Sequence, residues 1–183
     1  MSVIDTIRVV RGDITKIPAD AIVNAANESL MGGGGVDGAI HKAAGPELLQ
    51  ECKELRGCPT GDAKATKAYS LPAKFVIHTV GPVWHGGTSD EHRLLGRCYR
   101  RSLEEAAKKG CRRIAFPAIS CGAYGFPVDH AARTAVRAVT NYLSENDFFE
   151  EVDLVCFDET TEQAVRQALH ERSRELTEDD EAS

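Results

Sequence analysis

Short runs of apolar and β-branched residues recur along the chain and predict the strands of a sheet. The four most apolar runs are expected to be buried strands at residues 21–23, 75–80, 113–119 and 152–157. Two weaker runs, at residues 6–10 and 63–69, are expected nearer the edges of the sheet. The pattern therefore predicts a sheet of six strands.

Segments with apolar residues at helical spacing lie between these strands. "PELLQECKEL" begins with Pro46, which suits a first helical turn, and "TTEQAVRQAL" opens with a capping box of Thr160 and Gln163. Apolar positions three and four residues apart also predict helices over residues 95–106 and 132–143. Strands that alternate with helices indicate an α/β sandwich around a largely parallel sheet.

The chain has 183 residues, of which 42% are hydrophobic, and this is enough to build one sizeable core. We therefore expect one domain over residues 1–170. Much of the formal net charge of −6 lies in residues 171–183, which hold six carboxylates and two arginines and are expected to form a solvated, disordered tail. The body is close to neutral and shows no basic patch, so nucleic acid is not expected as the main ligand.

No apolar run approaches the roughly 20 residues that a membrane span requires, and the N-terminus lacks the regions of a signal peptide. We therefore expect a cytoplasmic protein that does not contact membranes, and we expect it to be a monomer. The six cysteines are scattered without a C-x-x-C pair, which indicates reduced thiols instead of a zinc site or a disulfide framework.

Two loops carry more glycine than a connection needs, and each follows a predicted strand and precedes a helix. The first lies within "NAANESLMGGGGVDGAIH" at residues 24–41, and the second is "SCGAYGFP" at residues 120–127. Ligands of such sheets bind outside the carboxyl ends of the strands. The first amide groups of a helix have no helical partner and bind phosphate when a flexible glycine loop precedes them. Two such loops predict a diphosphate site.

The segment "GGGVDG" also matches the G-x-G-x-x-G pattern of dinucleotide-binding proteins, which leaves a nicotinamide-dependent oxidoreductase as an alternative. The match is weak because "AANESLMG" separates the pattern from the preceding strand. The only acidic residues near the expected distance, Glu51 and Glu54, lie in a predicted helix and not at the end of a second strand. No G-K-[ST] follows the glycines, which excludes a nucleoside triphosphate loop.

Polar side chains in and near the first loop are candidates for chemistry. Asn24 and Asn27 leave the end of a buried strand, and we expect Asn27 to bind a sugar hydroxyl and Asn24 to hold the loop. Asp37 stands beside the predicted phosphate site, where a carboxylate repels phosphate, so we expect it to polarise a water. His41 lies one helical turn further and either orients Asp37 or a ligand hydroxyl, or is a buried core residue. His78, inside an apolar strand, is expected to be structural.

Five stretches, "RGDIT", "NAAN", "GGGGVDGAIH", "IHTVGPVW" and "FPAISCGAYGFP", resemble the signature motifs of the macrodomain family. The likeness is to the MacroD-type branch of O-acetyl-ADP-ribose deacetylases and ADP-ribose glycohydrolases, and it extends from Ile7 to Leu169. The resemblance implies a three-layer α/β/α sandwich around a mixed, mostly parallel six-stranded sheet. It also implies that the ligand is ADP-ribose, a diphosphate between two sugars with an adenine at one end.

The resemblance assigns roles to individual residues by their place in these motifs. Asp13 would accept the adenine amino group, Phe157 would pack against adenine, and Tyr124 would cover the distal ribose. Taken alone, Asp13 would be a turn residue and Phe157 a core residue. Cys121 stands where relatives often have threonine, and nothing marks it as a nucleophile. The predicted ligand contacts are Asp13, Ile14, Asn24, Gly34, Gly35, Val36, Gly38, Ala39, Ile40, Ser120, Cys121, Gly122, Ala123, Tyr124, Gly125 and Phe157.

The implied reaction is hydrolysis without a metal, a cofactor or a covalent intermediate. Asp37, Asn27 and His41 form the expected catalytic set, in which a water held by Asp37 and Asn27 attacks the substrate. The substrate is O-acetyl-ADP-ribose or a mono-ADP-ribosylated acidic side chain of a protein, and both place an ester on the distal ribose. The alternative is a reader module that binds ADP-ribose without turnover, although such relatives tend to lack the carboxylate at Asp37.

Overall fold

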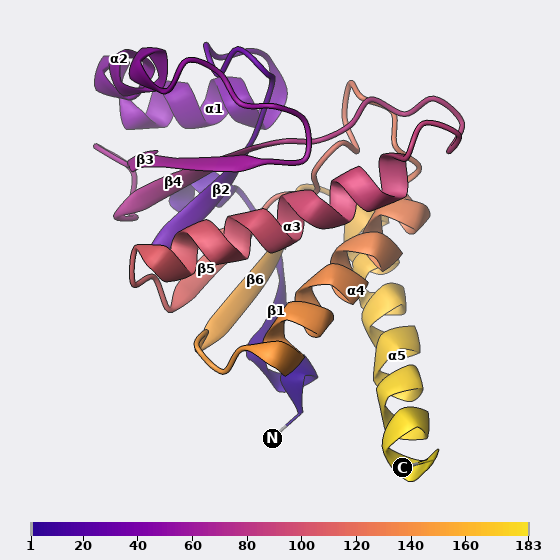
Figure 1. The fold of residues 1–183 in the computed structure, drawn as a ribbon. Helices are drawn as coiled ribbons and strands as arrows, with labels where there is room; N and C mark the ends of the chain where they lie inside the picture. Colours follow the sequence, from indigo (N-terminus) through magenta and orange to yellow (C-terminus); the bar gives the residue numbers. More distant parts are fainter. Residues whose placement is uncertain (1, 183) are drawn as a thin grey trace.

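The fold consists of one sheet between two layers of helices, and the computed structural model describes it for residues 2–182 (Figure 1). The strands are β1 (Ile7–Arg11), β2 (Ala21–Ala26), β3 (Ala63–Lys67), β4 (Phe75–Val80), β5 (Arg113–Phe116) and β6 (Glu151–Cys156). The helices are α1 (Gly35–Ala44), α2 (Pro46–Leu55), α3 (Glu91–Lys108), α4 (Val128–Glu145) and α5 (Glu159–Ala182). Two short 3-10 helices, η1 (Val3–Thr6) and η2 (Ile14–Lys16), flank β1.

The strands pair in the order β1-β6-β5-β2-β4-β3, and neighbours run parallel except β3, which is antiparallel to β4. This order confirms the three-layer sandwich with a mixed, mostly parallel sheet of six strands. The two weaker apolar runs form the edge strands β1 and β3, as predicted. The strand predicted at residues 113–119 ends at Phe116, because Pro117 has no backbone N–H to continue the ladder.

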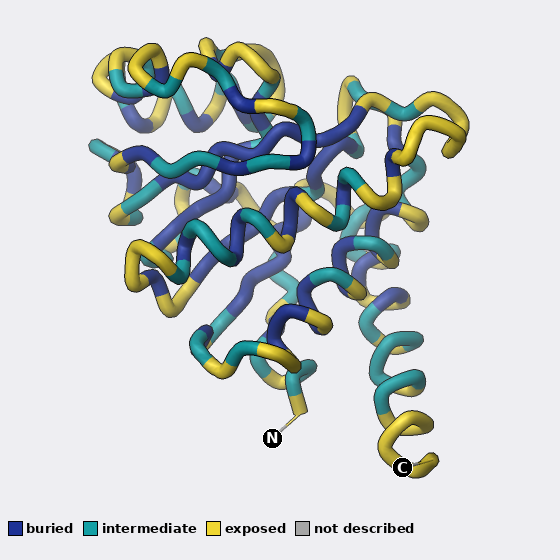
Figure 2. Tube along the Cα trace, viewed as in Figure 1, coloured by how far each residue is buried: buried dark blue, intermediate teal, exposed yellow. Residues whose placement is uncertain are grey.

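Apolar side chains from both faces of the sheet form two cores, one under each layer of helices. Figure 2 shows the sheet largely buried between the helices. On one face, α3, α4 and α5 cover side chains such as Ile77 and Leu154. On the other face, α1 and α2 cover Ile22 and Val76. Successive residues of a strand enter opposite cores, which is why the central strands are mostly apolar, with a few buried polar residues such as Asn24 and His78. Among the helices of residues 2–182, none combines the length and the apolar character that a membrane crossing requires.

The order of the strands brings the two glycine-rich loops together. β2 and β5 are parallel neighbours, so their carboxyl ends lie side by side at one edge of the sheet. The first loop connects β2 to α1, and the second connects β5 to α4. Loops that are far apart in the sequence therefore meet where open α/β sheets bind their ligands.

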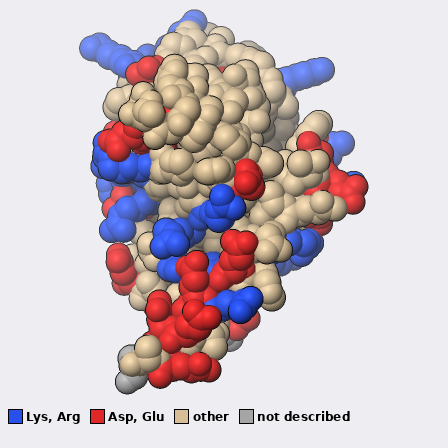
Figure 3. Space-filling view, turned by 90° about the vertical axis from the view of Figure 1, so that its right-hand side faces the viewer, with Lys and Arg blue, Asp and Glu red and all other residues tan. Residues whose placement is uncertain are grey.

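The C-terminal segment differs from the prediction of a disordered tail over residues 171–183. Helix α5 continues through this segment to Ala182. The Arg172 guanidinium anchors the start of this segment, because it donates to Thr140 Oγ1 at 3.0 Å and to Asn141 Oδ1 at 2.8 Å, both on α4. The net charge of residues 171–183 gives no sign of this contact. Acidic side chains gather toward the end of the helix, as Figure 3 shows at the bottom of the view.

Shortening the chain should separate the anchored part of α5 from its exposed end. A chain that ends after Glu175 keeps Arg172 and should unfold within about 1 °C of the full chain. A chain that ends after His170 loses hydrogen bonds worth about 1 kcal/mol each, so its midpoint should fall by roughly 3–8 °C. Thermal unfolding followed by circular dichroism measures both midpoints. Equal midpoints for the two truncations would contradict the anchoring role of Arg172.

Candidate functional site

A cleft of about 880 Å³ opens at the carboxyl ends of β2, β5 and β6. Both glycine-rich loops line it, together with η2 on one side and the start of α5 on the other. The predicted site residues along this cleft are Asp13, Ile14, Asn27, Gly34, Gly35, Val36, Asp37, Ala39, Ser120, Cys121, Gly122, Ala123, Tyr124 and Phe157. Those outside its wall are Asn24, Gly38, Ile40, His41 and Gly125.

The N-terminus of α1 presents backbone N–H groups to the cleft. The first N–H groups of the helix, from Gly35 to Asp37, have no acceptor within the helix, and the N-cap Gly34 has no side chain to cap them. Gly35 has a φ of +59°, which favours glycine. A Cβ on Gly38 would approach the carbonyl oxygen of Gly33 to 2.5 Å, so this glycine is required by packing. The glycine run therefore makes a tight turn whose donors suit an anion such as phosphate.

Two other predicted contacts, Ile40 and Gly125, have structural roles. Ile40 is fully buried and belongs to the core beneath α1 and α2. Gly125 has a φ of +71° and donates its N–H to Gly122 O at 3.0 Å, which closes a turn before α4. Both residues are adjacent in the sequence to residues that line the cleft. Only the structure shows that Ile40 and Gly125 do not line it themselves.

Asp37 is buried in the first turn of α1, with 4% of its surface exposed, and still lines the cleft. Its Oδ1 accepts a hydrogen bond from Asn24 Nδ2 at 2.8 Å and lies 3.4 Å from His41 Nε2. Its Oδ2 lies beside Gly33, where a Cβ would approach it to 3.2 Å. One oxygen is thus held by the protein and the other lies at the loop that lines the cleft. This arrangement suits a carboxylate that accepts a hydrogen bond from a bound water.

The role of holding the loop, which the sequence predicts for Asn24, belongs to Asn27 in the structure. Asn27 holds the first loop, because its Nδ2 donates to Gly32 O at 3.0 Å and its Oδ1 accepts from Leu30 N at 3.1 Å. It also lines the cleft, where the sequence predicts a contact with a sugar hydroxyl. Asn24 is fully buried and donates to the side chains of Asp37 and His78. The prediction that Asn24 holds the loop is therefore wrong, because its side chain points into the core and toward α1.

His41 packs behind Asp37 and does not line the cleft. Its Nε2 is buried and has no hydrogen-bond partner with good geometry within residues 2–182. The ring is therefore a buried group in contact with Asp37. This position fits a residue that orients Asp37 and does not fit a contact with a ligand hydroxyl.

His78 is fully buried on β4, as its apolar surroundings in the sequence predict. Its Nε2 lies 2.9 Å from Thr66 Oγ1, and its Nδ1 lies 3.1 Å from Asn24 Nδ2. Burial, with a smaller contribution from nearby His41, lowers the pKa of His78 to about 3. The ring therefore stays neutral in the folded protein at ordinary pH.

Replacing His78 with asparagine should make stability less dependent on pH. The native ring takes up a proton only near pH 3, whereas the unfolded chain takes it up near its ordinary pKa of about 6.5. Between these values the unfolded state binds more protons, so His78 lowers the free energy of unfolding by about 1.4 kcal/mol per unit as pH falls. Urea unfolding at about pH 5 and about pH 7.5 measures the slope. Exposed His170→Asn is the control, and an unchanged slope in His78→Asn would contradict the buried neutral ring.

The second loop closes on itself before α4. Ser120 has a φ of +66°, and its carbonyl oxygen accepts from Phe126 N at 3.0 Å. The N-cap of α4, Pro127, has no side chain that caps the helix. The Ser120 hydroxyl is buried without a hydrogen-bond partner in residues 2–182 and lies against Gly81, where any Cβ would overlap it. The loop therefore offers backbone donors and an unpaired hydroxyl opposite the N-terminus of α1.

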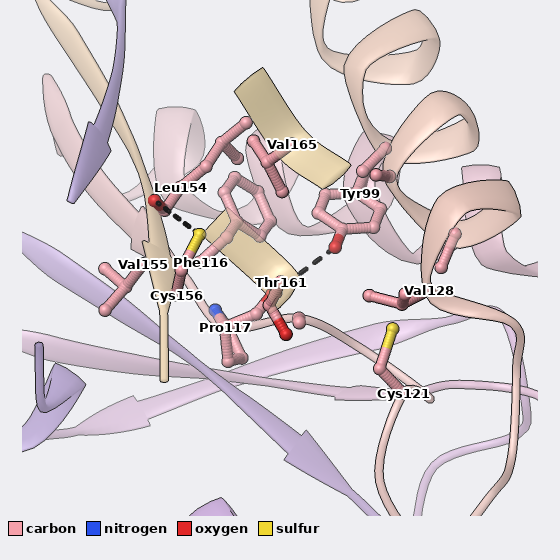
Figure 4. Close-up of a pocket in the computed structure, with 14 residues that line it drawn as sticks. Tyr99, Phe116, Pro117, Cys121, Val128, Leu154, Val155, Cys156, Thr161 and Val165 are labelled. Carbon is pink, nitrogen blue, oxygen red and sulfur yellow. Dashed lines mark hydrogen bonds between the residues drawn. The ribbon is translucent and has the colours of Figure 1, made fainter. Parts of the chain in front are cut away.

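Cys121 lies beside a small apolar cavity that adjoins the cleft (Figure 4). Burial, aided by the charge of Asp158, raises the pKa of its thiol to about 11. The thiol is therefore protonated at neutral pH and is not an activated nucleophile. On another side of the same cavity, the Tyr99 hydroxyl donates to Pro117 O at 3.4 Å and so holds the start of the second loop.

The segment between β4 and α3 supports the second loop from outside. Trp84 N–H donates to Tyr124 O at 2.8 Å, a contact that the sequence did not suggest. Buried Glu91 fixes this segment, because its carboxylate accepts from the N–H groups of His85 and Gly87, each at 2.8 Å. Burial acts to raise the pKa of Glu91, but these hydrogen bonds outweigh it and lower the pKa to about 2.

Asp13 and Phe157 line the cleft from η2 and from the segment after β6. Asp13 Oδ1 accepts from the Thr15 hydroxyl at 2.7 Å and from Thr15 N at 2.9 Å, and these bonds lower the pKa of the carboxyl group. Phe157 is 89% exposed, so its interpretation as a core residue is wrong. An exposed ring in the wall of a cleft offers a platform on which a flat base can stack.

Several cleft residues escaped prediction because they carry little chemistry of their own. Most are small or apolar residues next to the ends of strands, where position is the only signal. They are Gly12, Ala25, Ala26, Gly33, Gly81, Pro117, Ala118, Ile119, Val155, Asp158 and Thr161. Within residues 2–182, no group of three or more His, Cys, Asp or Glu side chains is arranged to hold a metal ion.

Residues 23–135 match the family described as Macro domain. A Macro domain-containing protein of Methanosarcina mazei is 58% identical over 166 residues, covering 91% of this chain and 89% of that protein. A protein of Enterobacter cloacae named O-acetyl-ADP-ribose deacetylase is 53% identical, covering 93% of this chain and 97% of that protein.

Solved structures agree with this assignment. The Oceanobacillus iheyensis macrodomain with ADP matches with a TM-score of 0.88 and 43% identity, covering 92% of each chain. The Trypanosoma brucei macrodomain in complex with ADP-ribose matches with a TM-score of 0.85 and 42% identity, covering 90% of this chain and 69% of that one. From its sequence, its fold and the place of its cleft, this chain belongs to the Macro domain family.

Proposed function

We propose that this protein binds ADP-ribose and hydrolyses esters on its distal ribose. The substrate classes are O-acetyl-ADP-ribose and acidic protein side chains that carry mono-ADP-ribose. The observation that carries the proposal is Asp37, a buried carboxylate with one oxygen bound by Asn24 and the other at the cleft, beside unpaired helix N–H groups. A carboxylate in the first turn stabilises the helix, but it repels a bound phosphate, so a module that only binds the anion would bind it better without this charge.

The ligand would extend along the cleft in the order set by its chemistry. The N–H groups at the start of α1 and the loop from Ser120 would bind the diphosphate from two sides. Phe157 and Asp13 would take the adenine, the ring by stacking and the carboxylate by accepting its amino group. The distal ribose would then lie near Asn27 and Asp37.

In the proposed reaction, Asp37 accepts a hydrogen bond from a water and directs its oxygen at the ester. For O-acetyl-ADP-ribose, the water oxygen bonds to the acetyl carbon, the bond from that carbon to the ribose oxygen breaks, and ribose regains a hydroxyl group. The products are acetate, a proton and ADP-ribose. For an ADP-ribosylated side chain, the water attacks the anomeric carbon and the side-chain carboxylate leaves. In both cases the fixed loop amides contribute positioning and electrostatic stabilisation.

The nicotinamide alternative fits the structure poorly. "GGGVDG" begins after an intervening loop and ends inside α1, and it does not directly follow β2. Glu51, one of the two acids at a suitable spacing, accepts from Lys67 N at the end of the edge strand β3 and from the Tyr69 hydroxyl. It is thus engaged in the fold and is not free to bind a ribose.

The proposal is tested with the full chain by calorimetric titration of ADP-ribose, NAD and AMP, followed by turnover assays. We expect ADP-ribose to bind most tightly. We also expect acetate release from O-acetyl-ADP-ribose, or ADP-ribose release from a glutamate-modified protein. Binding without turnover of either substrate would make the protein a reader, and preference for NAD over ADP-ribose would overturn the proposal.

A further inference from the structure

A chain of buried polar side chains runs from the edge strand β3 to Asp37. Thr66 Oγ1 lies 3.0 Å from Lys67 O and 2.9 Å from His78 Nε2. His78 Nδ1 lies 3.1 Å from Asn24 Nδ2, which in turn lies 2.8 Å from Asp37 Oδ1. Thr66, His78 and Asn24 each have at most 2% of their surface exposed. An isolated polar group is costly in such a place, so these hydrogen bonds contribute to the fold, and of the Asn24 amide only Oδ1 has no partner within residues 2–182.

The direction of each hydrogen bond follows from the two ends of the chain. Lys67 O is a carbonyl and only accepts, so the Thr66 hydroxyl donates to it and must accept from His78 Nε2–H. A neutral ring with its proton on Nε2 has a bare Nδ1, which accepts from Asn24 Nδ2. The Asp37 carboxylate also only accepts, so the same amide nitrogen gives its second hydrogen to Asp37. All four hydrogen bonds are consistent with a single arrangement of protons.

We infer that Thr66 and His78 are positioning residues, which act through Asn24 to hold Asp37 Oδ1. Asp37 Oδ2 is then left to accept a hydrogen bond from a water in the cleft. The inference rests on the proposed function for its effect on rate. If Thr66 no longer accepted, His78 could carry its proton on Nδ1, opposite the amide hydrogens of Asn24. Two facing donors repel each other, and rotation of the amide would turn its oxygen toward the Asp37 carboxylate. Asp37 would then lose its fixed partner.

Thr66→Val removes the hydroxyl at nearly constant volume, and Thr66→Ser is the matched control that keeps it. We expect Thr66→Val to lower kcat roughly 3- to 10-fold, the range for one buried hydrogen bond, with the Kd for ADP-ribose unchanged within about twofold. Thr66→Ser should keep kcat within about twofold of the parent. Equal kcat in Thr66→Val and the parent protein, or equal losses in Thr66→Val and Thr66→Ser, would overturn the inference.

A second pair of variants covers the case in which Thr66→Val fails to fold. In His78→Asn, the new side-chain oxygen can take the place of Nδ1 and accept from Asn24, whereas His78→Leu has no acceptor. We expect His78→Leu to lose more kcat than His78→Asn at equal ADP-ribose affinity. The reverse order would overturn the inference.

The nitrogen chemical shifts of the His78 ring give a readout that does not depend on turnover. In the unmodified protein we expect a single neutral form with the proton on Nε2 and a bare Nδ1, unchanged between about pH 5 and about pH 8. In Thr66→Val we expect a mixture of the two neutral forms. A proton on Nδ1 in the unmodified protein overturns the inference even if the enzyme is active. Absence of turnover in a protein with the expected shifts overturns the proposed function alone.

Discussion

Asp37→Ala is expected to slow turnover by roughly two to four powers of ten, the range for a positioned acid–base group. Loss of the carboxylate removes the group that accepts a hydrogen bond from the attacking water. Binding should respond differently, because a negative charge near the diphosphate is removed, so the affinity for ADP-ribose should stay similar or rise slightly. Product release from both substrate classes and calorimetric binding of ADP-ribose measure the two effects. Turnover of both substrates at the parent rate would contradict the assigned role.

Asp129 offers a matched control for this experiment. It is also an aspartate in the first turn of a helix, α4, but its side chain is 63% exposed and lies 3.8 Å from Arg133. Asp129→Ala therefore removes the same charge from the first turn of a helix without touching the cleft wall. It should leave turnover and affinity unchanged. A similar fall in turnover in Asp129→Ala would show that the effect of Asp37→Ala comes from net charge or from helix stability.

The sequence predicts the sheet well because its central strands are buried on both faces. Strands such as β4 are apolar and β-branched on both faces apart from His78, and this pattern differs clearly from a helical stripe. The glycine loops are equally visible, because their composition exceeds what a turn requires. Helix α5 shows what sequence patterns fail to predict. Its C-terminal segment is acidic overall, and this net charge gives no sign that Arg172 binds residues of α4 that are remote in the sequence. Net charge is a property of the whole segment, whereas the anchoring of this helix depends on one side chain, the Arg172 guanidinium.

Some residues of the candidate site can be predicted from the sequence, and others cannot. Motif and spacing find Asp37, because a carboxylate beside glycines is unusual in itself. Spacing does not separate Asn24 from Asn27, since the direction of each side chain depends on the pleat of β2 and on the course of the loop. The burial of Phe157 is also mispredicted. An apolar residue that follows an apolar run is expected to be buried, but β6 ends at Cys156 and the Phe157 side chain is exposed.

Gly34→Asp is expected to weaken ADP-ribose binding by at least about 30-fold while leaving the fold as stable as before or slightly more stable. Gly34 is the N-cap of α1 with a φ of −89°, and a Cβ there would meet nothing within 4 Å. An aspartate at this position can accept from the first N–H groups of the helix, which adds a few tenths of a kcal/mol. The same carboxylate would occupy the donors proposed for the diphosphate and repel its charge. Calorimetric titration and thermal unfolding measure the two changes.

Gly34→Asn separates charge from bulk, because asparagine has the shape of aspartate and caps helices about as well. Its stability should match that of Gly34→Asp, whereas its loss of affinity should be several-fold smaller, since no negative charge faces the diphosphate. Equal losses in both variants would show that the space at Gly34, and not the free N–H groups of α1, determines binding. Unchanged affinity in Gly34→Asp would remove the N-terminus of α1 from the ligand site. The proposal for Asp37 would then lose its phosphate neighbour and would have to rest on the second loop.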